Sequence, residues 1–150
     1  MIDGIVTDDA LAAGDGGLIL GLQRATHATL AALAGRLAGL DLGASEINAL
    51  ANLASAQPVS VGTLAVATAT RPTTLTSVLD RLARRGYVTR ELDAADRRSF
   101  LVSLTPPGAR AAAQVAAAVR SLEEDALATV TPGQRAGFAA VVRSFSEVPR

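Results

Sequence analysis

The sequence contains no cysteine and no tryptophan, all of its basic residues other than His27 are arginines, and His27 is its one histidine. The lack of cysteine excludes disulfides, thiolate metal sites and cysteine redox switches. With a single histidine, a metal site would depend on carboxylates, and the sequence shows no suitable carboxylate cluster. We therefore expect neither a metal nor another cofactor.

Aromatic residues are also scarce, at 3% of the chain, so the core must be built from alanine, leucine and valine. The longest uncharged run, between Glu46 and Arg71, includes several Asn, Gln, Ser and Thr residues and does not resemble a membrane span. The first residues are acidic and no signal-peptide pattern follows them. We expect a cytoplasmic protein without a membrane segment.

The charge is zero overall but unevenly distributed. The segment 71–98 holds seven arginines against four acidic residues, whereas the residues before Arg71 carry a net charge of −4. A concentrated basic segment is typical of a nucleic-acid-binding surface, even where the total charge is zero.

Apolar spacing and capping residues predict a mainly α (α+β) fold in one domain, 1–150, with the order α-α-α-α-β-β-α-α. The expected helices cover 16–40, about 45–55, a short stretch capped by Ser60, a stretch from Thr70 to Gly86, a stretch capped by Thr105, and about 131–146; the expected strands cover 87–92 and 99–104. Residues 1–15 are rich in glycine and aspartate, and we expect them to be flexible. The helix over 16–40 is apolar nearly all round, which favours a partner subunit as its cover.

A short helix, a tight turn at Ala69-Thr70 and a longer amphipathic helix predict a helix-turn-helix. The amino end of the second helix must reach the base edges of DNA, and it carries small polar and basic side chains there. The candidate reading residues are Thr70, Arg71, Thr73, Thr74 and Ser77. Thr70 is also the predicted cap of this helix, and Arg81, further along, is a candidate phosphate contact.

The hairpin after this helix has a charged tip, Asp93-Ala94-Ala95-Asp96-Arg97-Arg98, and is expected to form a wing. Arginines at such a tip can enter the minor groove, where the potential is most negative. Asp96 is either a turn residue with a solvated ion pair or a residue that orients an arginine side chain before DNA binds. We favour the second interpretation, because pre-ordering lowers the cost of fixing a long side chain.

Three motifs in this order make the sequence similar to the MarR family: Leu79-Asp80-Arg81-Leu82 with Gly86, then Asp93-Ala94-Ala95-Asp96-Arg97-Arg98, then Leu104-Thr105 with Gly108. The resemblance spans about residues 16–146. It implies a homodimer on a pseudo-palindromic site of double-stranded DNA, with dimerisation helices in 16–40 and 107–146 and a winged helix-turn-helix in 45–104. It also implies that Arg98, supported by Asp96, enters the minor groove and that Arg97 contacts phosphate or the groove beside it.

Many members of this family lose DNA affinity when a small aromatic or phenolic compound binds between the dimerisation helices and the winged domain. The resemblance therefore implies a repressor with such an effector. His27 is a candidate ligand-binding residue, although a structural histidine on a packed helix is the alternative.

Two other classes of function are alternatives to this interpretation. An enzyme is disfavoured, because the only carboxylate run, Glu123-Glu124-Asp125, would point in different directions on a helix. A winged-helix module that binds protein without binding DNA is the remaining alternative, since a fold does not fix a function. The arginines at the wing tip favour DNA.

Overall fold

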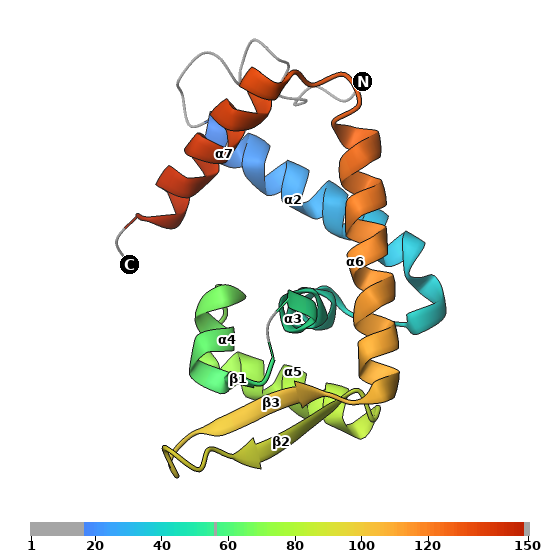
Figure 1. The fold of residues 1–150 in the computed structure, drawn as a ribbon. Helices are drawn as coiled ribbons and strands as arrows, with labels where there is room; N and C mark the ends of the chain where they lie inside the picture. Colours follow the sequence, from blue (N-terminus) through green and yellow to red (C-terminus); the bar gives the residue numbers. More distant parts are fainter. Residues whose placement is uncertain (1–16, 56, 149–150) are drawn as a thin grey trace.

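The computed structural model describes residues 17–55 and 57–148, and it confirms the mainly α fold class (Figure 1). Its elements in chain order are α2 (Gly17–Arg36), the 3-10 helix η1 (Ala38–Leu40), α3 (Ala44–Ser55), β1 (Val59–Ser60), α4 (Val61–Ala67), α5 (Pro72–Arg84), β2 (Val88–Leu92), β3 (Phe100–Leu104), α6 (Pro106–Ala126) and α7 (Pro132–Ser146). The predicted order is present, with η1 and β1 as additions. The expected flexibility of residues 1–15 lies outside the described residues.

Three helices begin at the hydroxyl side chains that the sequence predicted as caps. The hydroxyl oxygens of Ser60, Thr105 and Thr131 accept the backbone N–H groups of Thr63, Gly108 and Gln134 at 3.0, 3.0 and 3.3 Å. Each bond satisfies an amide that has no partner inside its helix. Thr131 and Gln134 complete a reciprocal capping box.

The first helix is shorter than the predicted range 16–40. α2 ends at Arg36, and a single 3-10 turn over Ala38–Leu40 follows it. Asp41 then takes a left-handed conformation with φ of 47°, which ends the turn. This change of direction allows Leu37 and Leu42 to be buried in the core on either side of the turn.

The sheet has three strands, in the order β1-β3-β2, rather than the two that the sequence predicted. β2 and β3 form the expected antiparallel hairpin, in which Val88 lies opposite Leu104 and Leu92 lies opposite Phe100. The two-residue strand β1 pairs with the other edge of β3, with Val59 opposite Val102. The additional strand connects the start of the helix-turn-helix to the wing.

The core is formed where α3, α4, α5, α6 and the sheet meet. Its largest fully buried side chains are Leu50, Leu53, Leu64, Leu75, Val78, Leu79, Leu82, Val102 and Val115. Apart from Ile47, leucine, valine and alanine supply the buried hydrophobic core, without any buried aromatic side chain among the described residues, as the composition predicted.

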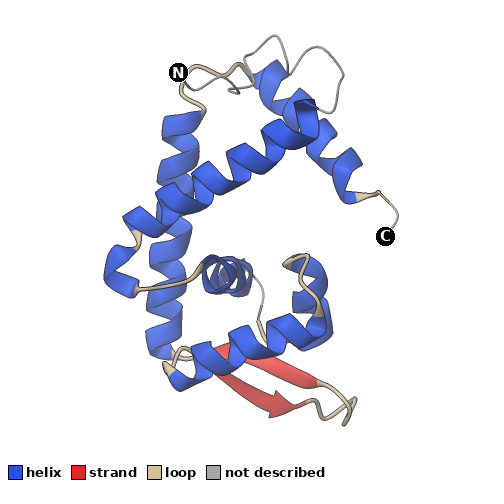
Figure 2. Ribbon diagram, turned by 180° about the vertical axis from the view of Figure 1, so that it is seen from behind, coloured by secondary structure: helices blue, strands red, loops and turns tan. Residues whose placement is uncertain are grey.

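The molecule is elongated, and α6 runs along it (Figures 1 and 2). α5 and the sheet lie at one end, α2 and α7 lie at the other, and α3 lies between them. Arg36 of α2 donates to Ser121 and Asp125 of α6, each at 2.7 Å, and so joins the two long helices. Within the described ranges, none of the helices combines the length and the apolarity needed to cross a bilayer.

Candidate nucleic-acid interface

The turn between α4 and α5 is held by backbone and side-chain hydrogen bonds. Ala69 has a positive φ of 51°, and the N–H of Thr70 donates to the carbonyl of Ala65 at 2.9 Å. The side-chain amide of Asn48, on α3, donates to the carbonyl of Thr68 at 3.2 Å. α3 is therefore bonded directly to the turn of the helix-turn-helix.

Thr70 does not cap α5, which corrects the prediction. The N-cap is Arg71, and it makes no side-chain capping bond. Thr70 lies one residue before the cap, and its hydroxyl donates to the carbonyl of Thr68 at 3.1 Å. Pro72 occupies the first turn of the helix, as predicted.

α5 has one apolar and one polar face. Its buried residues are Leu75, Val78, Leu79 and Leu82. The candidate reading residues Arg71, Thr73, Thr74 and Ser77 are all exposed, whereas Thr70 is half-buried. Four of the five predicted reading residues are therefore available to a partner at the amino end of α5.

Arg81 is held by a carboxylate that the sequence reasoning missed. Its Nε lies 3.4 Å from Oε1 of Glu46, whose side chain is only 8% exposed, while that of Arg81 is 46% exposed. The other oxygen, Oε2, accepts the N–H of Gly43 at 2.8 Å. The position of Glu46 in the first turn of α3 signals the bond to Gly43, since a carboxylate there can cap the helix, but it does not signal the contact with Arg81. Arg81 is thus anchored at one nitrogen and still partly exposed.

A second ion pair joins α5 to the wing. Nη2 of Arg90, on β2, is bonded to Oδ1 of Asp80, on α5. The two side chains are 28% and 43% exposed. Because this pair links the helix to the hairpin directly, it restrains the position of one relative to the other.

The wing tip is an ordered turn that projects its arginines outward. The N–H of Arg98 donates to Oδ1 of Asp96 at 3.0 Å, and the N–H of Ser99 donates to the Asp96 carbonyl at 2.8 Å. Arg97 and Arg98 are exposed, and neither forms an ion pair with a described residue. Asp96 therefore orders the backbone that carries Arg98 and does not contact its guanidinium group.

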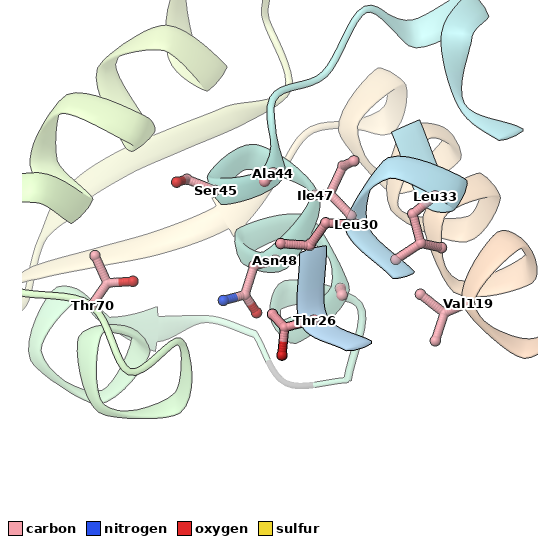
Figure 3. Close-up of a pocket in the computed structure, with 10 residues that line it drawn as sticks. Thr26, Leu30, Leu33, Ala44, Ser45, Ile47, Asn48, Thr70 and Val119 are labelled. Atoms are coloured by element: carbon pink, nitrogen blue, oxygen red, sulfur yellow. The ribbon is translucent and has the colours of Figure 1, made fainter. Parts of the chain in front are cut away.

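A cavity of about 360 Å³ lies where α2 and α3 approach the helix-turn-helix (Figure 3). Its apolar lining consists of Leu30, Leu33, Ala44, Ile47, Ala51 and Val119. Its polar lining consists of Thr26, Ser45, Asn48 and Thr70. His27 is exposed on α2 and is not part of this lining, although its neighbour Thr26 is.

The opposite end of the molecule carries exposed apolar side chains. None of the described residues of α7 is buried, and its Phe138 is 63% exposed. Leu18, Ile19 and Leu20 at the start of α2 are each more than half exposed. An apolar cavity of about 470 Å³ opens between α2, α6 and α7, with Phe138 in its lining. These helices leave an apolar surface uncovered in a single chain.

Comparisons with known proteins agree with this architecture. Residues 40–99 match the sequence model of the MarR family. A putative transcriptional regulatory protein for the hcr operon of Thauera aromatica is 28% identical over 61% of this chain. The match spans 57% of the length of that protein and 46% of the length of a second relative, an HTH-type transcriptional regulator from Mycobacterium leprae, so this chain spans about half the length of these curated relatives.

Solved structures match over nearly the whole chain. A MarR-family transcriptional regulator from Silicibacter pomeroyi is 26% identical, with a TM-score of 0.73 over 93% of this chain and 90% of its own. BpsR from Bordetella bronchiseptica is 25% identical, with a TM-score of 0.77 over 92% of this chain and 96% of its own. The DNA binding of BpsR is regulated by 6-hydroxynicotinic acid.

Proposed function

This chain belongs to the MarR family of transcriptional regulators, and we propose that it is a repressor that binds a pseudo-palindromic operator as a homodimer. It acts as a regulator rather than as an enzyme, and it acts in the cytoplasm. The alternative, a winged-helix module that binds protein instead of DNA, requires that the exposed arginines of the wing have another partner.

The observation that carries the proposal is the position of two polar surfaces at the same end of the molecule. The exposed amino end of α5 and the exposed wing tip lie together, away from α2 and α7 (Figure 1). A helix fits the wide major groove, and hydroxyl groups such as those of Thr73, Thr74 and Ser77 can bond base edges or phosphates there. Arg97 and Arg98 then contact the adjacent minor groove and its phosphates, and the exposed part of Arg81 contacts the backbone.

The uncovered apolar helices support the proposed homodimer. The exposed apolar side chains of α2 and α7 favour an interface with another protein chain. A two-fold axis relating two copies presents two reading helices, which a pseudo-palindromic site matches.

Release of DNA is assigned to the cavity beside the helix-turn-helix. Asn48 lines this cavity and also donates to the carbonyl of Thr68 in the turn before α5. A small aromatic or phenolic ligand there would bias the angle of α5, because it would bind one arrangement of α3 and the turn more tightly than the other. The regulation of BpsR by a small aromatic acid is a precedent for such an effector.

Arg98→Ala tests the assignment of the wing. We expect this variant to bind the promoter region beside its own gene about tenfold more weakly, and to lower the slope of log K against log salt by about one unit. Fluorescence anisotropy across a salt series measures both quantities.

Arg120→Ala is the matched control, since Arg120 is an exposed arginine on α6. An unchanged salt slope for Arg98→Ala would reject the wing assignment. Failure of the unmodified protein to shift this DNA would favour the protein-binding alternative.

A further inference from the structure

Two apolar side chains on the wing lie outside the hydrophobic core. Leu92, the last residue of β2, is 60% exposed, and Phe100, the first residue of β3, is 46% exposed. The register places them directly opposite each other, so they form one cross-strand pair. Neither is part of the core that the described residues form, or of the partly buried side chains packed against it. The packing of the core therefore does not account for this apolar pair.

The pair lies on the face of the hairpin that is turned toward α5. Alternate residues of a strand share a face, so Leu92 lies on the same face as Arg90, and Phe100 lies on the same face as Val102. Arg90 is bonded to Asp80 of α5, and Val102 is fully buried in the core. Leu92 and Phe100 continue this face beyond the core, so they lie between the contact with α5 and the wing tip.

The wing tip beside this pair presents cations. Arg97 and Arg98 are exposed and form no ion pair with a described residue. The two carboxylates of the tip are directed at its own backbone: Oδ1 of Asp93 accepts the N–H of Ala95 at 2.8 Å, and Oδ1 of Asp96 accepts the N–H of Arg98 at 3.0 Å. A partner that suits this surface is anionic and also offers apolar groups.

A strand of DNA has this chemistry. In the proposed complex, α5 lies in the major groove and the wing arginines lie in the adjacent minor groove. One sugar-phosphate strand separates the two grooves, so it passes along the face between α5 and the wing tip. Its phosphates are anionic, whereas its deoxyribose rings present C–H groups against which apolar side chains can pack. The hairpin lies at the end of the molecule opposite α2 and α7, so the proposed dimer leaves it open (Figures 1 and 2).

We propose that Leu92 and Phe100 pack against deoxyribose rings of the DNA strand that separates the two grooves. This inference rests on the proposed function, in which α5 and the wing bind DNA. An apolar contact releases no counterions from DNA, whereas a contact between an arginine and a phosphate does. The pair therefore strengthens binding by an amount that does not depend on salt, in contrast to Arg98.

Phe100→Ala tests this contact. We expect the variant to bind the promoter DNA about tenfold more weakly at every salt concentration, because apolar area but no cation is lost. The slope of log K against log salt should stay unchanged. Leu92→Ala should act in the same way, with a loss of about three- to fivefold. Fluorescence anisotropy across a salt series measures both quantities, and an unchanged affinity or a lowered slope would overturn the inference.

Leu101→Ala is the matched control. Leu101 is the neighbour of Phe100 on β3, but it lies on the other face of the hairpin, opposite Glu91. Its DNA affinity should stay within about twofold of that of the unmodified protein, and so should that of Phe100→Leu, which keeps an apolar side chain. An equal loss for Leu101→Ala would assign the effect to the order of the hairpin and overturn the inference. Urea denaturation shows whether each variant is folded.

Two further measurements identify what the pair contacts. In promoter DNA with uracil in place of thymine, the loss caused by Phe100→Ala should persist, because the sugars are unchanged. Disappearance of the loss would assign the contact to thymine methyl groups and overturn the inference. Light scattering should show the same oligomeric state for Phe100→Ala and the unmodified protein. A smaller assembly would make the pair a contact between copies of the chain, which also overturns the inference.

DNA binding by the unmodified protein keeps the two conclusions separate. If the unmodified protein binds its promoter DNA and Phe100→Ala binds it equally well, only the inference fails. If the unmodified protein binds no DNA, the proposed function fails and the inference fails with it.

Discussion

At the scale of single residues, Gly108 is the position where the fold tolerates no side chain. A Cβ built on Gly108 would lie 1.8 Å from the carbonyl oxygen of Tyr87, a backbone atom that cannot rotate away. The same oxygen accepts the N–H of Thr105 at 3.0 Å, which joins the start of α6 to the start of β2. We expect Gly108→Ala to lower the free energy of unfolding by about 3 kcal/mol, at the upper end of the effect of overpacking. Urea denaturation measures it.

Gly133→Ala is the control for this prediction. Gly133 also lies in the first turn of a helix that follows a threonine cap and a proline, but an added Cβ would meet nothing within 4 Å. Alanine favours helix over glycine, so this variant should be neutral or more stable by up to about 1 kcal/mol. A similar loss of stability in both variants would mean that glycine is needed for its flexibility and not for close packing.

The sequence predicts those residue roles that depend on near neighbours in the chain. The caps at Ser60, Thr105 and Thr131 each involve an amide three residues further on, so they were predictable. The contact between Glu46 and Arg81 joins two helices, and no local pattern reveals it. Thr70 was assigned wrongly because α5 begins at Pro72, with Arg71 as its N-cap, one residue later than the sequence predicted.

At the scale of elements, the ion pair between Asp80 and Arg90 is expected to set the distance between the reading helix and the wing. Breaking it by Arg90→Ala should cost about 0.5–1 kcal/mol of stability, because both side chains are partly exposed. The affinity for DNA should also fall, by about three- to tenfold, because the wing must then be ordered as it binds. A double-mutant cycle with Asp80→Ala, read out by both unfolding and DNA affinity, measures the coupling.

The ion pair between Arg36 and Asp125 is the matched control, because it also joins two elements but connects α2 to α6. Breaking it should leave the affinity of the dimer for DNA within about twofold of that of the unmodified protein, because exposed ion pairs contribute little. If the Asp80–Arg90 cycle showed coupling in unfolding but none in DNA affinity, the pair would be structural only.

Elements with a strong apolar period were predictable, and those defined by distant partners were not. Leu75, Val78, Leu79 and Leu82 follow helical spacing, and all are buried in α5 as expected. β1 has only two residues and exists because it pairs with β3, far along the chain. A strand of that length has no period of its own, so the sequence could not reveal it.

At the scale of the whole molecule, the sequence could indicate which segments face a partner but not how they are arranged. The apolar character of the helix over 16–40 predicted a covering subunit, and α2 does leave Leu18, Ile19 and Leu20 exposed. The position of the cavity depends on how α3 packs against α2 and the turn before α5, which no local pattern determines. The sequence therefore predicted His27 as the ligand-binding residue, whereas its neighbour Thr26 lines the cavity.

Phe138→Glu tests the link between the two ends of the molecule. Phe138 is 63% exposed in the single chain, so glutamate should leave the fold of that chain intact. In a homodimer through α2 and α7, two copies of this side chain are covered, and their loss should weaken association by about 3–6 kcal/mol. Light scattering after gel filtration should show a monomer. The monomer should bind the full operator no more tightly than a half-site, because the gain in affinity from two linked DNA-binding domains is lost.

Ala140→Glu is the control for the added charge. Ala140 is exposed and lies two residues beyond Phe138, which places it near the opposite side of α7. This variant should remain a dimer and keep its preference for the full operator. If Phe138→Glu remained a dimer as well, the subunits would have to associate through another surface. If it became a monomer that still preferred the full operator, recognition of the two half-sites would not depend on this interface.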